Sequence, residues 1–341
     1  PLLASSAASD VYKRQELDFT NYNDTILESL LTQVVTRSKR KVAGQFSTPR
    51  ELAVFLSALT MKNKASRVLD PCCGTGTIAK ASYDIKRVSG ISSIESIKQV
   101  WAGDKFRYPL QFAMLALTSP ENMGQQINIY KEDVFNLAPN EKISIHDANS
   151  NNILSVDCDK YDSIISNLPF VQQENLLELN STAIEFINKT NSIFNGRSDL
   201  YAYIALKLDD ILSEKGRIGI IVSNSWLGTE FGDKFFEELN KRYNVECIIT
   251  SGKGRWFKNV DVVTNIIILN KKDISKVQDI KFIVINEDIV DLIGNKDVTL
   301  QVENASRLVA KIRKGINTEE FIINSYSDKE IKDLDSMGMI K

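Results

Sequence analysis

The chain has 341 residues, of which 43% are hydrophobic and 25% are charged. This apolar content is sufficient for the core of one large or two ordinary domains, so the composition excludes a disordered protein. The formal net charge of −2 excludes the strong basic excess with which a protein grips nucleic acid by charge alone.

Cysteine and histidine are scarce in this chain. The four cysteines include the adjacent pair Cys72 and Cys73 and form neither a disulfide framework nor a CxxC metal-binding pattern. The single histidine, His146, makes a zinc site or a histidine-based acid–base mechanism unattractive. We therefore expect reduced cysteines, no metal, and a solvated His146 in a polar loop.

The sequence gives no sign of a membrane protein, because no stretch approaches the roughly 18 apolar residues of a membrane span. We expect a cytoplasmic protein without a membrane partner. Residues 1–15 are rich in Ala and Ser and share no pattern with the rest of the chain. They look like a translated cloning scar or adaptor, so we exclude them from the fold.

Residues 16–62 are expected to form a short N-terminal helical segment. Apolar residues at helical spacing predict a helix over about 22–41, and its basic end either complements the helix dipole or contacts phosphate. The stretch Gly44-Gln-Phe-Ser-Thr-Pro-Arg50 is predicted to be a turn before a helix over 51–61. We expect Ser47 or Thr48 as its N-cap and Pro49 at the first helical position.

The stretch Ser66-Arg-Val-Leu-Asp-Pro-Cys-Cys-Gly-Thr-Gly-Thr77 has the pattern of a ligand-binding turn. A buried strand ends at Asp70, and a helix begins at Thr77. Gly74 and Gly76 let the backbone approach a ligand where a Cβ would collide. In open α/β sheets ligands bind at this end of the strands, although glycines in this spacing also occur in ordinary tight turns.

Further along the chain, strands and helices alternate, which predicts a doubly wound, mostly parallel α/β sheet. Strands are expected near residues 99–103, 127–130, 161–167, 217–223, 245–250 and 262–270, and helices near 77–83, 106–117, 199–212 and 230–243. The last two strands have no helix between them and are expected to form an antiparallel hairpin. Polar loops are expected over 136–159 and 187–197, and residues 272–341 should hold one strand at 280–285 and charged helical pieces.

Three motifs follow one another in the chain: the Phe-Ser-Thr-Pro block, Asp-Pro-Cys-Cys-Gly-Thr-Gly, and Tyr161-Asp-Ser-Ile-Ile-Ser-Asn-Leu-Pro-Phe170. In this order they resemble the S-adenosylmethionine-dependent amino-methyltransferases, specifically the DNA adenine-N6 methyltransferases of the type I restriction-modification class. The resemblance covers about residues 20–271. It implies a seven-stranded, mostly parallel Rossmann-like sheet, S-adenosylmethionine as cofactor, a catalytic domain over 63–272, and a C-terminal extension over 273–341 that is an incomplete recognition or partner-binding region.

The resemblance also implies which residues bind the cofactor. The Phe-Ser-Thr-Pro block would cover its methionine end, and Asp133 would accept from its adenine amine while Val134 or Phe135 packs on the ring. Asp104, at the end of the second strand, is placed to accept from both ribose hydroxyls, with a solvated strand-end aspartate as the alternative. The predicted cofactor-binding residues are Phe46, Thr48, Pro49, Asp70, Pro71, Gly74, Thr75, Gly76, Asp104, Asp133, Val134 and Phe135.

The predicted catalytic residues are Asn167, Leu168, Pro169 and Phe170. The adenine amine is a poor nucleophile because its lone pair is delocalised into the ring. Two acceptors, the Asn167 side-chain oxygen and the Leu168 carbonyl, would favour a pyramidal nitrogen that can attack the methyl group. Leu168 stands where the family usually has proline, so rigidity depends on Pro169, while Phe170 offers a face for a flipped base.

The implied activity is adenine-specific DNA methylation by the modification component of a restriction-modification or related defence system. Double-stranded DNA, a specificity subunit or missing recognition domain, and a restriction subunit are the expected partners. Lys253, Arg255, Trp256 and Lys258 either contact DNA or form an ordinary exposed aromatic loop.

Three alternatives remain open. A cofactor-binding but catalytically weakened scaffold subunit is suggested by Leu168 and by the missing recognition domain. An RNA adenine methyltransferase is suggested because RNA adenine dimethylases also carry Asn-Leu-Pro-Tyr or Phe, although they lack the Phe-Ser-Thr-Pro block. A dinucleotide-binding oxidoreductase is disfavoured because the third glycine of Gly-x-Gly-x-x-Gly is absent.

Overall fold

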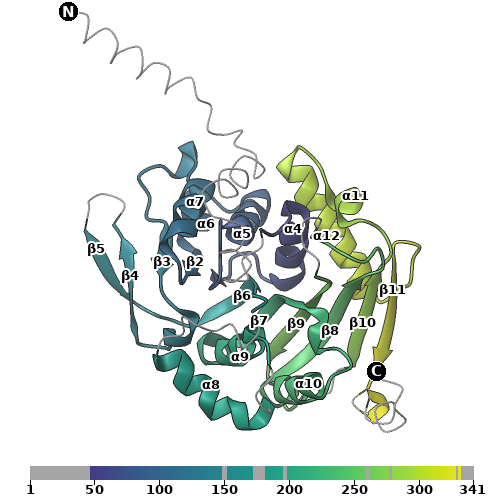
Figure 1. Ribbon diagram of the computed structural model, residues 1–341. Coiled ribbons are helices and arrows are strands. Elements are labelled where there is room, and N and C mark those ends of the chain that lie inside the picture. The colour runs from purple at the N-terminus through teal and green to yellow at the C-terminus, as the bar shows by residue number, and fades with distance from the viewer. Residues whose placement is uncertain are drawn as a thin grey trace, which may run out of the picture.

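The computed structural model describes residues 47–147, 152–171, 181–194, 198–257, 262–275, 279–327 and 329–331. The strands of these residues form one sheet, and helices lie on both of its faces (Figure 1). The helix expected near 22–41 and Phe46 lie outside the described residues, as does Lys258.

Five neighbouring strands form the parallel centre of the sheet, in the order β7-β6-β1-β2-β3. They are β1 (Val68–Asp70), β2 (Val100–Asp104), β3 (Asn128–Lys131), β6 (Tyr161–Asn167) and β7 (Leu212–Ser223). The chain winds outward from β1 to β3 and then crosses back to β6 on the other side of β1. The carboxyl ends of β1 and β6 therefore flank the switch point at which open α/β sheets bind ligands.

The seven-stranded sheet that we expected is wrong, because the sheet of the described residues is mixed and has 11 strands. The expected antiparallel arrangement of the two late strands is confirmed, with β9 (Thr264–Lys271) lying antiparallel between β7 and β8 (Tyr243–Ser251). Beyond β8, the predicted strand β10 (Ile280–Ile285) pairs parallel with it, and β11 (Phe321–Tyr326) closes that edge.

The opposite edge carries an unexpected hairpin in the segment predicted to be a polar loop. Strands β4 (Lys142–His146) and β5 (Ile153–Asp157) pair antiparallel, and β4 joins β3. Ile143 and Ile145 are buried while their neighbours in β4 are exposed. This period of two is the signal of a half-buried strand, and His146 is its last residue rather than part of a loop.

Helices from the two ends of the chain share one face of the sheet (Figure 1). They are α4 (Arg50–Thr60), α5 (Thr77–Val88), α6 (Ser93–Lys98), α7 (Arg107–Leu117), α11 (Ile289–Ile293) and α12 (Val298–Lys314). Buried residues of α4, α5, α11 and α12 belong to one apolar cluster with β10 and β11. The C-terminal strands and α12 therefore continue the sheet and core that carry the glycine turn.

Three helices cover the other face: α8 (Ser181–Phe194), α9 (Leu200–Lys207) and α10 (Glu230–Arg242). The expected loop over 187–197 is wrong up to Phe194, because α8 runs through it. Ala183, Ile187 and Phe194 share one helical face and are buried in the core beneath that face of the sheet. None of the helices in the described ranges is long and apolar enough to cross a bilayer.

Candidate active site

Four neighbouring strands carry polar residues at or just after their carboxyl ends. Asp70 ends β1, Asp104 ends β2, Asn167 ends β6, and Asp133 follows β3 by two residues. These strands lie in the order β6-β1-β2-β3 and run parallel, so their carboxyl ends lie side by side. The structure thus brings together residues of two predicted motifs, Asp70 and Asn167, with the predicted strand-end residues Asp104 and Asp133.

The two glycines of the turn between β1 and α5 serve different purposes. Gly76 has a φ of 85°, and a Cβ there would lie 2.8 Å from the Cα of Ala113 in α7, so only glycine lets the two helices pack. Gly74 has a φ of 51°, and a Cβ there would meet nothing within 4 Å. The backbone at Gly74 therefore borders open space that a ligand could occupy, and the predicted turn residues Pro71 and Thr75 lie in the same loop.

Asp104 holds this turn in place. Its Oδ2 accepts the Gly74 amide at 3.0 Å, and its Oδ1 accepts the Phe106 amide at 2.8 Å. Burial raises the pKa of Asp104 to about 6, although both amides favour the carboxylate. A carboxylate has about four acceptor sites, so Asp104 keeps the capacity to accept from ligand hydroxyls as well.

Asp70 braces β1 against β6 across the switch point. Its Oδ1 accepts from the Ser166 hydroxyl at 2.7 Å and from the Cys72 amide at 3.3 Å. Burial raises the pKa of Asp70 to about 7 in spite of these bonds. We did not predict Ser166, because β6 also contains Asp162 and Ser163, so one more serine in this strand does not stand out in the sequence.

Asp133 and the two residues after it lie beside the end of β3. Asp133 caps the short 3-10 helix η3 (Val134–Asn136) by accepting from the Phe135 amide at 3.2 Å, and its Oδ2 lies 3.5 Å from Lys105 Nζ. Val134 and Phe135 are buried, and the Phe135 ring packs 5.6 Å from that of Phe186 in α8.

The cysteines beside the turn are free thiols, as are the other two. Burial raises the pKa of Cys72 and of Cys73 well above the ordinary value, and nearby aspartates add to the effect. Both thiols are therefore protonated at neutral pH and are poor nucleophiles.

Asn167 is linked to the N-terminal block by a side-chain hydrogen bond. Its Nδ2 donates to Thr48 Oγ1 at 3.1 Å, across 119 positions of sequence. The expected capping of α4 is wrong, because Pro49 is the N-cap, Arg50 is the first helical residue, and no side chain caps this end. The Thr48 hydroxyl contacts Asn167 instead, and because the amide oxygen lies opposite Nδ2, this bond sets the direction of Oδ1.

The remaining residues of the Asn-Leu-Pro-Phe motif are fixed by their neighbours. The Leu168 amide donates to the Ile221 carbonyl of β7 at 3.1 Å, and the Leu168 side chain is buried. Pro169 and Phe170 are half-buried, and the Phe170 ring lies edge-on to Phe257 with centroids 6.4 Å apart. Trp256 is buried, so our expectation of an exposed tryptophan in this loop is wrong.

Comparison with known proteins assigns these motifs to one family. The family model described as N-6 DNA methylase matches residues 23–337. The chain belongs to the N-6 DNA methylase family. This match covers more of the chain than the resemblance we found in the sequence, and it includes β10, β11 and α12.

The relatives of this family member include a methylase subunit and solved modification subunits. The chain is 23% identical over 272 residues to the methylase subunit of the type I restriction enzyme EcoEI from Escherichia coli, covering 76% of this chain and 50% of that protein. The chain spans half or less of the length of the curated relatives it matches.

Two solved structures show the fold. The modification subunit of a putative type I restriction enzyme from Vibrio vulnificus YJ016 superposes with a TM-score of 0.56 at 17% identity, covering 90% of this chain and 61% of that one. A putative class I S-adenosylmethionine-dependent methyltransferase from Listeria monocytogenes gives a TM-score of 0.55 at 16% identity, covering 86% and 82%. The α/β fold of this N-6 DNA methylase is therefore methyltransferase-like.

Proposed function

We propose that this chain transfers a methyl group from S-adenosylmethionine to the N6 amine of a flipped adenine in DNA. The observation that carries the proposal is the position of Asn167. It ends β6 next to the glycine turn of β1, and Thr48 orients its amide. An amide acceptor beside a cofactor-binding turn is what methylation of an exocyclic amine requires.

The residues at the strand ends fit the cofactor. Asp104 would accept from the ribose hydroxyls, Asp133 from the adenine amine, and the Gly74 backbone would lie against the cofactor in the open space beside it. The proposed cofactor-binding set is completed by Asp70, Pro71, Thr75, Gly76, Val134, Phe135, Thr48 and Pro49, together with Phe46. When bound, S-adenosylmethionine supplies an electrophilic methyl group on a sulfonium.

The side chain of Asn167 and the backbone of Leu168 would activate the adenine. Their two oxygens would accept from the two amine hydrogens, so the nitrogen becomes pyramidal and its lone pair can point at the methyl group. The flipped base would stack on Phe170, which contributes about 1–3 kcal/mol, comparable to the cost of flipping the base. The methylated nitrogen would carry a surplus proton and would release it to water, so no general base has to act before the attack. The single histidine of the chain lies in β4.

Leu168 does not by itself indicate a weakened enzyme. Proline at this position would fix φ but would lack an amide hydrogen. The Leu168 amide donates to Ile221, so here a hydrogen bond to β7 restrains the same backbone. This contact favours an active methyltransferase over the cofactor-binding scaffold.

We also propose that the chain works as the modification component of a restriction-modification or related defence system. Its similarity to a type I methylase subunit and to a type I modification subunit supports this assignment. Double-stranded DNA would be the substrate. Because the net charge is −2, a specificity subunit or further recognition domain would supply sequence-specific binding, and a restriction subunit would be a further partner.

The test is to sequence modified bases in DNA and in RNA from cells that express this chain with and without its neighbouring genes. We expect N6-methyladenine at a defined sequence, and none in cells that express Asn167→Ala at the same protein level. Methylated adenine confined to RNA would favour the RNA methyltransferase. No methylation with any neighbouring gene would favour the scaffold.

A further inference from the structure

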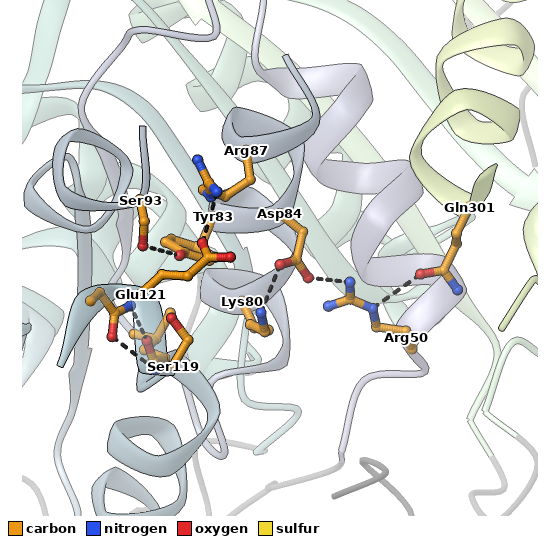
Figure 2. Close-up of polar contacts among 11 residues, drawn as sticks. Arg50, Lys80, Tyr83, Asp84, Arg87, Ser93, Ser119, Glu121 and Gln301 are labelled. Atoms are coloured by element: carbon orange, nitrogen blue, oxygen red, sulfur yellow. Dashed lines mark hydrogen bonds and ion pairs between the residues drawn. The ribbon is translucent and has the colours of Figure 1, made fainter. Parts of the chain in front are cut away.

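A second polar network joins the start of α4 to α5 and α12 (Figure 2). Arg50, two residues after Thr48, places its guanidinium between α5 and α12. Its Nη2 pairs with Asp84 Oδ2 of α5, and its Nε donates to Gln301 Oε1 of α12 at 3.1 Å. Asp84 Oδ1 also accepts from Lys80 Nζ at 2.7 Å. Three helices thus meet at one guanidinium.

This network connects two parts of the proposed site. Helix α5 begins directly after Gly76 and carries Asp84 two turns later. Helix α4 begins directly after Thr48 and Pro49. The pair of Arg50 and Asp84 therefore fixes the start of α4 relative to the helix that carries the glycine turn.

The start of α4 has no side-chain cap, although Glu51 in its first turn suits the helix dipole. Its N-cap is Pro49, which makes no side-chain capping bond, and the Thr48 hydroxyl is bonded to Asn167. A cation in the first turn is also unfavourable toward the helix dipole. The stability of α4 as a helix therefore does not explain an arginine at its first position.

The burial of the ion pair between Arg50 and Asp84 indicates that it positions helices more than it stabilises the fold. The side chains of Arg50 and Asp84 are 16% and 6% exposed. Replacing a buried ion pair by apolar residues often costs nothing in stability, whereas such a pair defines one arrangement of the elements it joins. Arginine is suited to this because its planar fork bonds two partners in fixed directions.

We propose that Arg50 is a positioning residue for methyl transfer. Through Asp84 and Gln301 it holds the first turn of α4, and with it the Thr48 hydroxyl, where Thr48 orients the amide of Asn167. This inference rests on the proposed function. It extends the proposed machinery to a side chain that itself contacts neither cofactor nor base.

The test is a double-mutant cycle between the ion pair and Thr48. The paired variant Arg50→Met with Asp84→Leu removes both charges together, and Lys80 can turn to water because it is 30% exposed. We expect kcat of this variant to fall about 10- to 100-fold, the loss that small misplacements cause, with a smaller loss of cofactor affinity because Thr48 and Pro49 belong to the proposed cofactor-binding set. In a Thr48→Val background the same paired change should cost little more, because Arg50 acts through Thr48. Independent, additive losses would overturn the proposal.

A more exposed ion pair of α5, which does not involve α4, supplies a control. Arg87 of α5 pairs with Glu121 at 2.7 Å and donates to the Ile91 carbonyl at 2.8 Å, and neither partner belongs to α4 (Figure 2). The paired variant Arg87→Met with Glu121→Leu should leave kcat unchanged. An equal loss of kcat in both paired variants would indicate a general effect of removing ion pairs from α5 and would contradict a specific role for Arg50.

Hydrogen exchange supplies a measurement that does not depend on methylation. The Ala53 amide donates to the Pro49 carbonyl at 2.9 Å and reports on the first turn of α4. The Arg50→Met with Asp84→Leu variant should exchange this amide faster than the wild type, while amides of β9 remain protected. Unchanged exchange at Ala53 would refute the positioning role. If the wild type methylates no DNA, the proposed function fails, and exchange at Ala53 still decides whether Arg50 holds this turn.

Discussion

The carboxylate of Asp104 has a structural role in the turn and a proposed role in cofactor binding. It accepts the amides of Gly74 and Phe106, which shape the turn, and in the proposed function it also accepts from the cofactor ribose. Because burial raises its pKa to about 6, its charge is retained at neutral pH but is lost within the mildly acidic range. Protonation puts a hydrogen on one oxygen and removes part of the acceptor capacity.

We therefore predict that cofactor affinity falls as the pH is lowered through about 6. Asp104→Asn, which keeps one acceptor for the turn, should bind the cofactor about 1.5–3 kcal/mol more weakly at neutral pH, the value of hydrogen bonds to a charged group. Its affinity should also depend less on pH in this range, although Asp70 still titrates. Calorimetric titrations of both proteins between mildly acidic and mildly alkaline pH measure this difference. Equal affinities and superimposable pH profiles would exclude Asp104 from the ribose site.

The sequence predicted those site residues whose position follows from their own strand. Asp70, Asp104 and Asn167 each end a strand that is recognisable from its apolar residues. Their position at the same end of a parallel sheet could therefore be inferred from the sequence. Ser166, Lys105 and Arg50 were not predicted, because each acts through a partner from another element. Such long-range pairs leave no local periodicity.

At the level of elements, the turn between β1 and α5 depends on close packing of α5 against α7. Gly76 and Gly90 both have left-handed backbones, with φ of 85° and 88°. They differ in their surroundings: a Cβ at Gly76 would collide with the backbone of Ala113, whereas a Cβ at Gly90 meets nothing within 4 Å. The two positions thus separate backbone strain from lost packing.

We predict that Gly90→Ala costs about 1–2 kcal/mol of unfolding free energy, the strain of a left-handed alanine. Gly76→Ala should cost several kcal/mol more than this, because α7 must move, and it should also weaken cofactor binding. Urea unfolding of the two variants provides the comparison. Equal losses would show that α5 and α7 do not pack as closely as the structure indicates.

Elements were predicted well where one pattern dominated. The parallel strands and the helices α5, α7 and α10 show continuous apolar runs or clear helical spacing. The hairpin of β4 and β5 and the helix α8 were missed because polar residues between their few buried positions resemble loop sequence. In β4 every second residue is buried, and in α8 the buried residues Ala183 and Ile187 lie four positions apart. Burial of these few residues against the core determines both elements.

At the level of the whole molecule, the two ends of the described chain share one core. Val309 of α12 is 2% exposed and belongs to the apolar cluster that contains α4. The expected C-terminal extension could not be placed from sequence, because β10 and β11 join the sheet through pairings with no local signal of register.

A charge inside this shared core should destabilise the whole molecule. We predict that Val309→Asp lowers the unfolding free energy by about 3 kcal/mol or more, since it buries a carboxylate without a partner. The control is Val298→Asp at the first residue of α12, which is 42% exposed, where an acidic residue suits the helix dipole. The unfolding free energy of this control should stay within about 0.5 kcal/mol of the wild-type value.

Denaturation followed at β1 and at β11 should show one transition. A separate transition for β11 would mean that the C-terminal part folds independently.

The central claim is that Asn167 activates the adenine and does not hold the cofactor. The most direct measurement compares wild type and Asn167→Ala in two assays: calorimetric binding of S-adenosylmethionine, and transfer of labelled methyl groups to DNA in the presence of the specificity partner. We predict that Asn167→Ala binds the cofactor nearly as tightly as the wild type but forms no N6-methyladenine. Methyl transfer by the variant at the wild-type rate, or an equal loss of binding and transfer, would contradict the assigned role.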